Sequence, residues 1–87
     1  MIYLKQPGEE KAYAADFGLY LADGQSLVSS TATVTPSGLG VAGTRIDTDV
    51  VHVTLYGGKA GVIYRVEIAV GVDNGDDEVQ EILVRVA

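Results

Sequence analysis

The sequence predicts an all-β fold, an immunoglobulin-like β-sandwich of about seven short antiparallel strands. Two observations predict it: apolar and polar residues alternate over several short segments, and turn residues separate these segments at regular spacing. The composition agrees, because the chain has one Phe, one Met and no Trp. The core must therefore be built from aliphatic residues and tyrosines, many of them β-branched types that suit a pleated sheet.

The length of 87 residues indicates one domain spanning residues 1–87. Residues 1–6 stand slightly apart, because Pro7-Gly8 closes this short apolar segment. The sequence leaves open whether they form an edge strand of the domain or an arm that pairs with a neighbour. Lys5, Pro7 and Lys11 are the residues here that would protect such an edge from unwanted pairing.

The segment Glu9–Ala22 fits two patterns. Large apolar residues recur in it every four positions, which fits a helix, but alternate residues from Tyr13 to Leu21 are also apolar, which fits a strand. Gly18 interrupts the helical pattern, and everything downstream is strand-like. We therefore expect a strand to about Phe17 and then a short irregular or 3₁₀ turn before Asp23-Gly24.

The middle of the chain alternates turn signals with strand signals. Asp23-Gly24 is a strong turn pair, and Ser26–Thr35 is a run of Ser, Thr and Val without a helical period. Pro36–Gly40 has the composition of a loop. A weak strand at Val41–Ile46 and a second turn at Asp47-Thr48-Asp49 follow.

The stretch Val50–Val72 is the part on which the rest of the prediction depends. Its apolar residues alternate in two runs separated by a glycine-rich segment, which predicts two half-buried strands and the turn between them. The expected inward residues are Val51, Val53, Leu55, Tyr64, Val66, Ile68, Val70 and Val72. Glycines tolerate a positive φ, so the chain can reverse or cross over tightly here, and we expect a hairpin.

Tyr64 lies near the start of the second of these strands, three residues after Gly61. A tyrosine in this position can pack its ring inward while its hydroxyl returns to the backbone, as in the tyrosine corner of immunoglobulin-like sandwiches. A tyrosine that only fills the core fits equally well. In both cases Tyr64, with Gly57, Gly58 and Gly61, has a structural role.

An acidic turn and a final strand end the sequence. Asp73-Asn74-Gly75-Asp76 has Asn-Gly at its centre, which is typical of a hairpin turn. Gln80–Ala87 follows as the last strand, with Ile82, Val84 and Val86 inward.

The charge of the chain argues against two classes of partner. Six basic and twelve acidic residues give a formal net charge of −6, and no cluster of Lys or Arg is present to neutralise phosphates. The field would repel nucleic acid and anionic membranes. The chain has neither a signal-peptide pattern nor an apolar run as long as a membrane span, so we expect a protein made in the cytoplasm.

No pattern predicts an enzyme, a cofactor or a metal site. The chain has no cysteine, and its only histidine, His52, alternates to the face opposite the core without a positioned catalytic partner. The acidic turn at 73–78 offers oxygen ligands of the kind that calcium takes, but it departs from the known calcium-loop pattern. Whether it binds a cation stays open.

The outward positions carry more apolar side chains than a free monomer needs, which predicts an assembly surface. Ala69 is one of these outward residues. The candidate interface residues are Tyr3, Tyr20, Val50, His52, Tyr56, Ile63 and Leu83.

Several segments together carry a resemblance to a known family. They are Lys5-Gln6-Pro7-Gly8-Glu9, Asp16-Phe17, Tyr20–Leu27, Leu55–Val66, and Asp76-Asp77-Glu78 before Ile82–Val86. The most specific pieces are Leu21-Ala22-Asp23-Gly24 and Gly57-Gly58-Lys59-Ala60-Gly61 followed by Tyr64. In this order and spacing, over nearly the whole chain, they resemble small immunoglobulin-like virion proteins of tailed bacteriophages and prophages, the phage fibre–tail adaptor-like family. The chain departs from the family at Phe17, Tyr20 and Ala32, where the family tends to have tryptophans.

The resemblance implies a non-enzymatic structural protein of a virion, synthesised in the bacterial host cytoplasm. It would dock in multiple copies onto other virion proteins of the capsid, tail or fibre, as a tail or fibre attachment adaptor or a capsid decoration, with a homo-oligomer left open. The alternative is a stand-alone fibronectin III-like module that binds carbohydrate or a cell-surface ligand. That function requires Tyr3, Tyr20 and Tyr56 to lie on one face, and the fold alone does not decide between the two.

Overall fold

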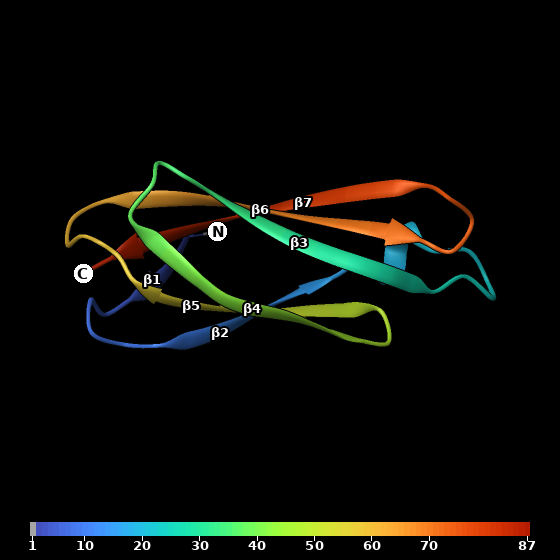
Figure 1. The fold of residues 1–87 in the computed structure, drawn as a ribbon, viewed down its shortest axis with the longest axis horizontal. Coiled ribbons are helices and arrows are strands. Elements are labelled where there is room, and N and C mark those ends of the chain that lie inside the picture. The colour runs from blue at the N-terminus through green and yellow to red at the C-terminus, as the bar shows by residue number, and fades with distance from the viewer. Residues whose placement is uncertain (1) are drawn as a thin grey trace.

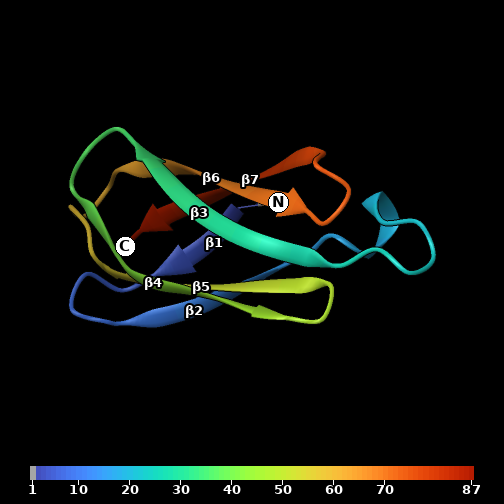
Figure 2. The ribbon, with the colours of Figure 1, turned by 45° about the vertical axis from the view of Figure 1, so that its right-hand side comes forward.

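A computed structural model describes residues 2–87, which form a sandwich of two β-sheets (Figures 1 and 2). Within these residues one sheet has the strand order β1-β7-β6-β3 and the other the order β2-β5-β4. The prediction of an all-β sandwich is confirmed. The elements are β1 (Ile2–Lys5), β2 (Lys11–Asp16), the 3₁₀ turn η1 (Gly18–Tyr20), β3 (Leu27–Thr35), β4 (Leu39–Asp47), β5 (Val50–Gly57), β6 (Ile63–Val72) and β7 (Asp77–Val86).

The core lies between the two sheets and contains every residue predicted to point inward in the last three strands. Successive side chains of a strand point to opposite faces, so one face of each strand is buried while the other meets solvent. The buried members from these strands are Val51, Val53, Leu55, Tyr64, Val66, Ile68, Val70, Val72, Ile82, Val84 and Val86.

The strand expected before Phe17 and the 3₁₀ turn after it are both present. Each residue of β2 pairs with β5 in an unbroken antiparallel register, which satisfies backbone groups that a helix would have satisfied locally. Phe17 closes this end of the core, since its side chain is fully buried and its N–H donates to the carbonyl of Asp49 at 2.8 Å. The chain then turns through η1, where the N–H of Tyr20 donates to the carbonyl of Phe17.

The expected hairpin between β5 and β6 is wrong. β5 pairs with β2 and β4, whereas β6 pairs with β3 and β7, so the glycine segment carries the chain from one sheet to the other. Gly58 has a φ of 96°, and a Cβ on it would lie 2.7 Å from Val86 Cγ2. Gly58 therefore permits a close approach to β7, whereas a Cβ on Gly57 or Gly61 would meet no atom within 4 Å and these two glycines serve their positive φ alone. Local sequence does not reveal which sheet the second strand joins.

The expectation of antiparallel strands throughout is wrong for β1. This strand runs parallel to β7, with Ile2 opposite Leu83 and Lys5 opposite Val86. The hairpin turn expected at Asp73–Asp76 is confirmed, because β6 and β7 pair antiparallel on either side of it. Two strands are longer than expected, since β4 begins at Leu39 and β7 at Asp77.

Two tyrosines of the core differ in the environment of their hydroxyl groups. The ring of Tyr64 is buried, and its hydroxyl oxygen accepts a hydrogen bond from the N–H of Lys59 at 2.9 Å. Tyr64 therefore both fills the core and bonds to the backbone, so the two expected roles are combined. The Tyr13 hydroxyl is buried without a hydrogen-bond partner among the described residues. Burial, together with the nearby Glu9 carboxylate, raises the pKa of Tyr13 above its ordinary value of 10.0.

Removing these two hydroxyls should have different effects on stability. We expect Tyr64→Phe to lower the free energy of unfolding by about 1–2 kcal/mol, because it leaves the Lys59 N–H without its acceptor. Tyr13→Phe, the matched control, should leave stability unchanged or raise it, because it removes a buried polar atom that has no partner. Urea unfolding of both variants measures the difference, and an equal loss in both would contradict the role assigned to Tyr64.

The raised pKa of Tyr13 also predicts how stability depends on alkaline pH. An acid whose pKa is higher in the folded state favours folding fully below the unfolded pKa of 10.0, and this contribution is lost as pH rises through the folded pKa. Stability should therefore fall above pH 10 more steeply in the wild type than in Tyr13→Phe. Unfolding curves collected at pH values on both sides of 10 would show equal slopes if the burial of Tyr13 had no such effect.

Candidate functional site

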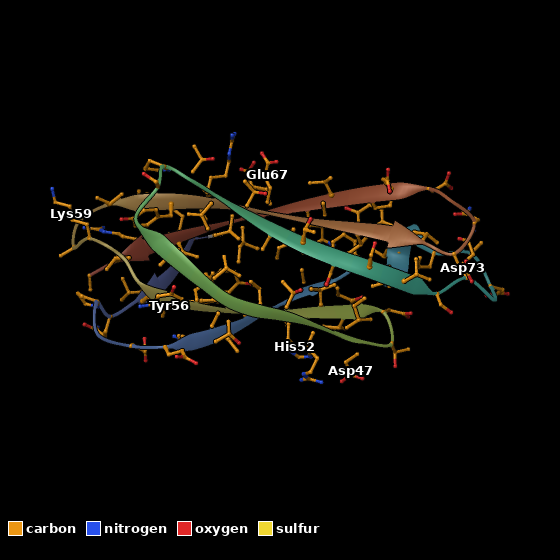
Figure 3. All side chains as sticks on the ribbon, in the orientation of Figure 1. Asp47, His52, Tyr56, Lys59, Glu67 and Asp73 are labelled. Atoms are coloured by element: carbon orange, nitrogen blue, oxygen red, sulfur yellow. The ribbon has the colours of Figure 1, made fainter. Side chains whose placement is uncertain are left out.

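The candidate interface residues lie mainly on two opposite faces of the sandwich. Val50, His52 and Tyr56 alternate along β5 on the outer face of the three-stranded sheet. Ile63 of β6 and Leu83 of β7 lie on the outer face of the four-stranded sheet. Figure 3 shows the two sides, with His52 pointing away from one sheet and Glu67 of β6 pointing away from the other. The candidates therefore form two surfaces, back to back.

Tyr3 and Tyr20 lie apart from both surfaces. Tyr3 points inward from β1 and packs against Tyr13, with 5.1 Å between the ring centroids. Tyr20 belongs to η1 at one end of the sandwich, where its half-exposed ring lies 5.7 Å from that of Phe17. Tyr3, Tyr20 and Tyr56 thus do not share a face, and the aromatic platform that a carbohydrate module requires is not formed by them.

The outer face of the four-stranded sheet carries an apolar patch with two arginines. Leu4, Arg85 and Ile63 are direct neighbours in one row across β1, β7 and β6, and Ile2, Leu83 and Arg65 form the next row. Side chains opposite each other on neighbouring strands lie about 4.5–5.5 Å apart at Cβ, so the six residues are contiguous. We call them the β1–β7–β6 patch.

Sequence reasoning missed four of the six residues of this patch, including two of its four apolar side chains. Ile2 and Leu4 are about half exposed and were not among the candidates, because their place beside β7 depends on a pairing between the two ends of the chain. The alternation of Ile2 and Leu4 with Tyr3 and Lys5 was the available signal. It indicates a strand with two different faces, but it does not show where the strand docks.

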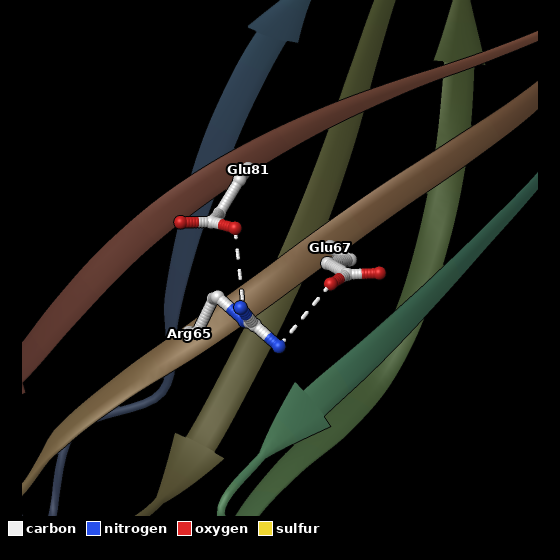
Figure 4. A network of polar contacts seen from close by, with 3 residues as sticks. All are labelled: Arg65, Glu67 and Glu81. Atoms are coloured by element: carbon white, nitrogen blue, oxygen red, sulfur yellow. Dashed lines mark ion pairs between the residues drawn. The ribbon is translucent and has the colours of Figure 1, made fainter.

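The two arginines of the patch differ in their ion pairing. Arg65 contacts Glu67 at 3.5 Å and Glu81 at 3.6 Å (Figure 4). All three side chains are about half exposed, so these ion pairs contribute little to stability. Arg85 is exposed and forms no ion pair with any described residue. A partner of this patch would meet apolar side chains and guanidinium groups together.

The outer face of the three-stranded sheet is built from small residues and is shallowly hollowed. A depression of about 340 Å³ is lined by Glu10, Ala12, Ala42, Gly43, Thr44, Arg45, His52 and Thr54. Beside it the ring of Tyr56 lies over Gly40, where a Cβ would come within 2.2 Å of the ring. His52 lies 4.0 Å from the Asp47 carboxylate, and both side chains are partly exposed.

Within the acidic turn, Asn74 and Asp76 bond to each other. The Asn74 amide donates to Asp76 Oδ2, and the Asp76 N–H donates to Asn74 Oδ1. No group of three or more His, Asp or Glu side chains in residues 2–87 is placed to hold a metal ion. Across the same residues, no helix has the length and apolar character needed to cross a membrane.

Lys5 has a different role from the edge protection that the sequence suggested, and that expectation is wrong. Its side chain is fully buried, and its ammonium donates to the carbonyl oxygens of Gln6 and Gly57, both at 2.8 Å. An ammonium removed from water needs such acceptors. Lys5 thereby ties the end of β1 to the crossover after β5, and β1 is an edge strand of its own domain.

Replacing Lys5 tests this tie. We expect Lys5→Met to lower the free energy of unfolding by about 1–3 kcal/mol, because it leaves the partly buried Gly57 carbonyl without this donor. Lys11→Met is the matched control. The Lys11 ammonium is exposed, donates to Leu4 O at 3.3 Å and lies 5.7 Å from the centroid of the Tyr13 ring, so its loss should change stability little. Thermal and urea unfolding measure both, and a Lys5→Met variant as stable as the wild type would refute the tie.

Comparison with known proteins identifies the family of the chain. A search of the curated proteins found no match. A family model described as podophage GP4 fiber-tail adaptor protein gp77 matches residues 5–85. The matched range begins at the last residue of β1 and ends within β7, so it contains every strand from β2 to β6. The resemblance seen in the sequence is thereby confirmed, and the chain belongs to the podophage GP4 fiber-tail adaptor family, whose members are structural proteins of the phage.

Proposed function

We propose that this protein is a non-enzymatic adaptor at the site where tail and fibre join, and that it holds two different virion proteins on its two opposite sheet faces. The back-to-back placement of the two surfaces carries the proposal. An adaptor must contact two partners at once, and a rigid sandwich separates two such contacts without a linker. The family to which the chain belongs supports the same role.

The chemistry of the surfaces differs, which supports two unlike partners. The β1–β7–β6 patch offers Ile2, Leu4, Ile63 and Leu83 beside Arg65 and Arg85, and it fits a partner surface with apolar and acidic side chains. On the opposite face, the ring of Tyr56 lies over Gly40, next to the depression that His52 and Arg45 help to line. Tyrosine and arginine are frequent anchors of protein interfaces, so each face has at least one anchor of its own.

The size of the faces fits modest single contacts used in several copies. The Cα trace measures 42 × 19 × 17 Å, so one broad face offers on the order of 800 Å², the share of one partner in a standard interface. A repeating virion surface would multiply such contacts, and avidity would then hold the assembly firmly. The same argument allows copies of the chain to sit side by side.

Two single substitutions can separate the two contacts. Ile63→Glu and Tyr56→Glu each place a charge on one half-exposed position, so both variants should fold like the wild type. In competition with an equal amount of wild-type protein for incorporation into particles, each should be disfavoured. Crosslinking of the incorporated copies should show Ile63→Glu losing one neighbour and Tyr56→Glu losing another.

Thr31→Glu is the matched control, because Thr31 is exposed on the four-stranded face, opposite Ala69 and outside the patch. It should be incorporated as well as the wild type. Loss of the same neighbour in both face variants would show one interface instead of two. A wild-type protein absent from purified particles would overturn the virion role itself and move the cell-surface binding module to first place.

A further inference from the structure

The first half of β7 has no strand beside it on its outer edge. β1 pairs with β7 only from Leu83 to Val86, so within residues 2–87 the segment 77–82 has a neighbour on one side only, namely β6. An edge of this kind presents unpaired backbone groups and is a template for another strand. The position that an additional strand would take continues the line of β1.

The direction of the backbone groups at this edge follows from the hydrogen bonds at both ends of β7. Asp76 O accepts from the N–H of Val72 and the N–H of Val86 donates to Val62 O, so the even-numbered residues face β6. The N–H of Ala87 donates to Lys5 O, so the odd-numbered residues face the β1 side. Backbone groups alternate along a strand, and Asp77, Val79 and Glu81 therefore direct their N–H and C=O groups to the free edge.

The side chains at the edge leave room for a strand in the plane of the sheet. Asp77, Val79 and Glu81 are exposed, Val79 by 53%, and they lie on the outer face. On the inner side the Gln80 amide donates to the carbonyl of Asp16 at the end of β2. This contact bridges the two sheets, so an incoming strand would extend the four-stranded sheet and would not enter the core.

The edge belongs to the acidic end of the molecule. Eight of the twelve acidic residues lie at this end: Asp16, Asp23, Asp47, Asp49, Asp73, Asp76, Asp77 and Glu78. No Lys or Arg occurs in the segments 16–26, 47–50 and 72–78 that carry them. Lys59, in contrast, lies at the opposite end of the long axis from Asp73 (Figure 3). The acidic end would therefore attract a basic segment.

The same charges disfavour a second copy as the occupant. Two β7 edges paired with each other would bring Asp77 and Glu81 of one copy against the acidic residues of the other. Like charges directly opposite in a sheet are destabilising. A partner with the complementary sign fits the edge better than the chain itself does.

We propose that the free edge of β7, Asp77–Ile82, accepts an extended segment of another virion protein that carries a basic, an apolar and a second basic residue at alternate positions. The backbone of this segment pairs with Asp77, Val79 and Glu81, its apolar side chain covers Val79, and its basic side chains meet Asp77 and Glu81. This is strand addition to an exposed sheet edge, with side-chain chemistry choosing the partner. The inference rests on the proposed adaptor function and names the chemistry of one partner.

Amide hydrogen exchange of the wild-type protein, free and inside purified particles, tests the pairing. In the free protein the amides of Val79 and Glu81 should exchange faster than those of Gln80 and Ile82, which face β6. In particles the segment 77–82 should become protected. A protein that is present in particles but whose segment 77–82 exchanges as in the free state would overturn this inference and leave the adaptor function standing, whereas absence from particles would overturn the adaptor function.

Val79→Pro removes one N–H from the free edge without breaking the ladder to β6, and proline is tolerated at such positions. In competition with the wild type it should be incorporated at least about tenfold less well, because it loses a backbone bond and obstructs the pairing. Ala14→Pro is the matched control. The Phe17 N–H faces β5, so the Ala14 N–H points to the free edge of β2. Its incorporation should be normal.

A charge reversal keeps the test decisive if the proline variant fails to fold. Asp77→Lys should reduce incorporation by about tenfold, because an attraction at the edge becomes a repulsion. Asp23→Lys makes the same change of charge in the exposed loop after η1 and should have little effect. Equal losses in both variants would show attraction to the acidic end in general, and would overturn strand pairing at β7.

Discussion

The passage of the chain from one sheet to the other between β5 and β6 is the constraint on which the rest of the structure depends. At this passage the Gly61 N–H donates to Val86 O, the Val86 N–H donates to Val62 O, and the Lys5 ammonium reaches Gly57 O. The crossover therefore holds the ends of β1, β5 and β7 together. Tyr64 also holds the crossover, because its hydroxyl accepts a hydrogen bond from the Lys59 N–H while its ring fills the core.

These hydrogen bonds at the crossover help to explain how an 87-residue chain with few large side chains holds its two sheets together. A domain of this size buries only about 60–65% of its unfolded surface, so hydrophobic burial alone leaves a small margin. The buried ammonium of Lys5 and the buried hydroxyl of Tyr64 add directional bonds at one end. The opposite end, with its acidic turns, is closed by Phe17 and by the contact of Gln80 with Asp16.

Local sequence patterns were sufficient to predict where the strands lie and which of their faces is buried. They could not predict which strands pair with each other. The alternation in Val51, Val53 and Leu55 reports only that one face is buried, which is true whichever sheet the strand joins. For this reason the inward residues were correct while the hairpin between β5 and β6 was not. Lys5 shows the same limit. A lysine two residues before Pro7 looks like a solvent-exposed residue that protects a strand edge, until the fold brings the carbonyl of Gly57, far along the chain, to its ammonium.

The sequence predicted only part of the candidate surfaces, for a related reason. Ile63 and Leu83 could be chosen because the strands that contain them have a clear inner face, which makes the outer one apparent. Ile2 and Leu4 could not, because they become part of a surface only when β1 lies beside β7. The sequence predicted the acidic segment 73–78 as a turn. It could not show that this turn lies beside an unpaired edge, because that depends on which part of β7 is paired with β1.

The fold itself requires neither the exposed apolar residues nor the free edge. Every buried position of β6 and β7 is filled by the inward residues, so a polar side chain at Ile63 or Val79 would leave the core unchanged. An unprotected edge invites uncontrolled pairing between copies, and acidic side chains at Asp77 and Glu81 oppose it by repulsion. The same charges become attractive when a basic strand arrives. A single feature can thus keep free copies apart and still admit a partner, which is what an adaptor needs before assembly.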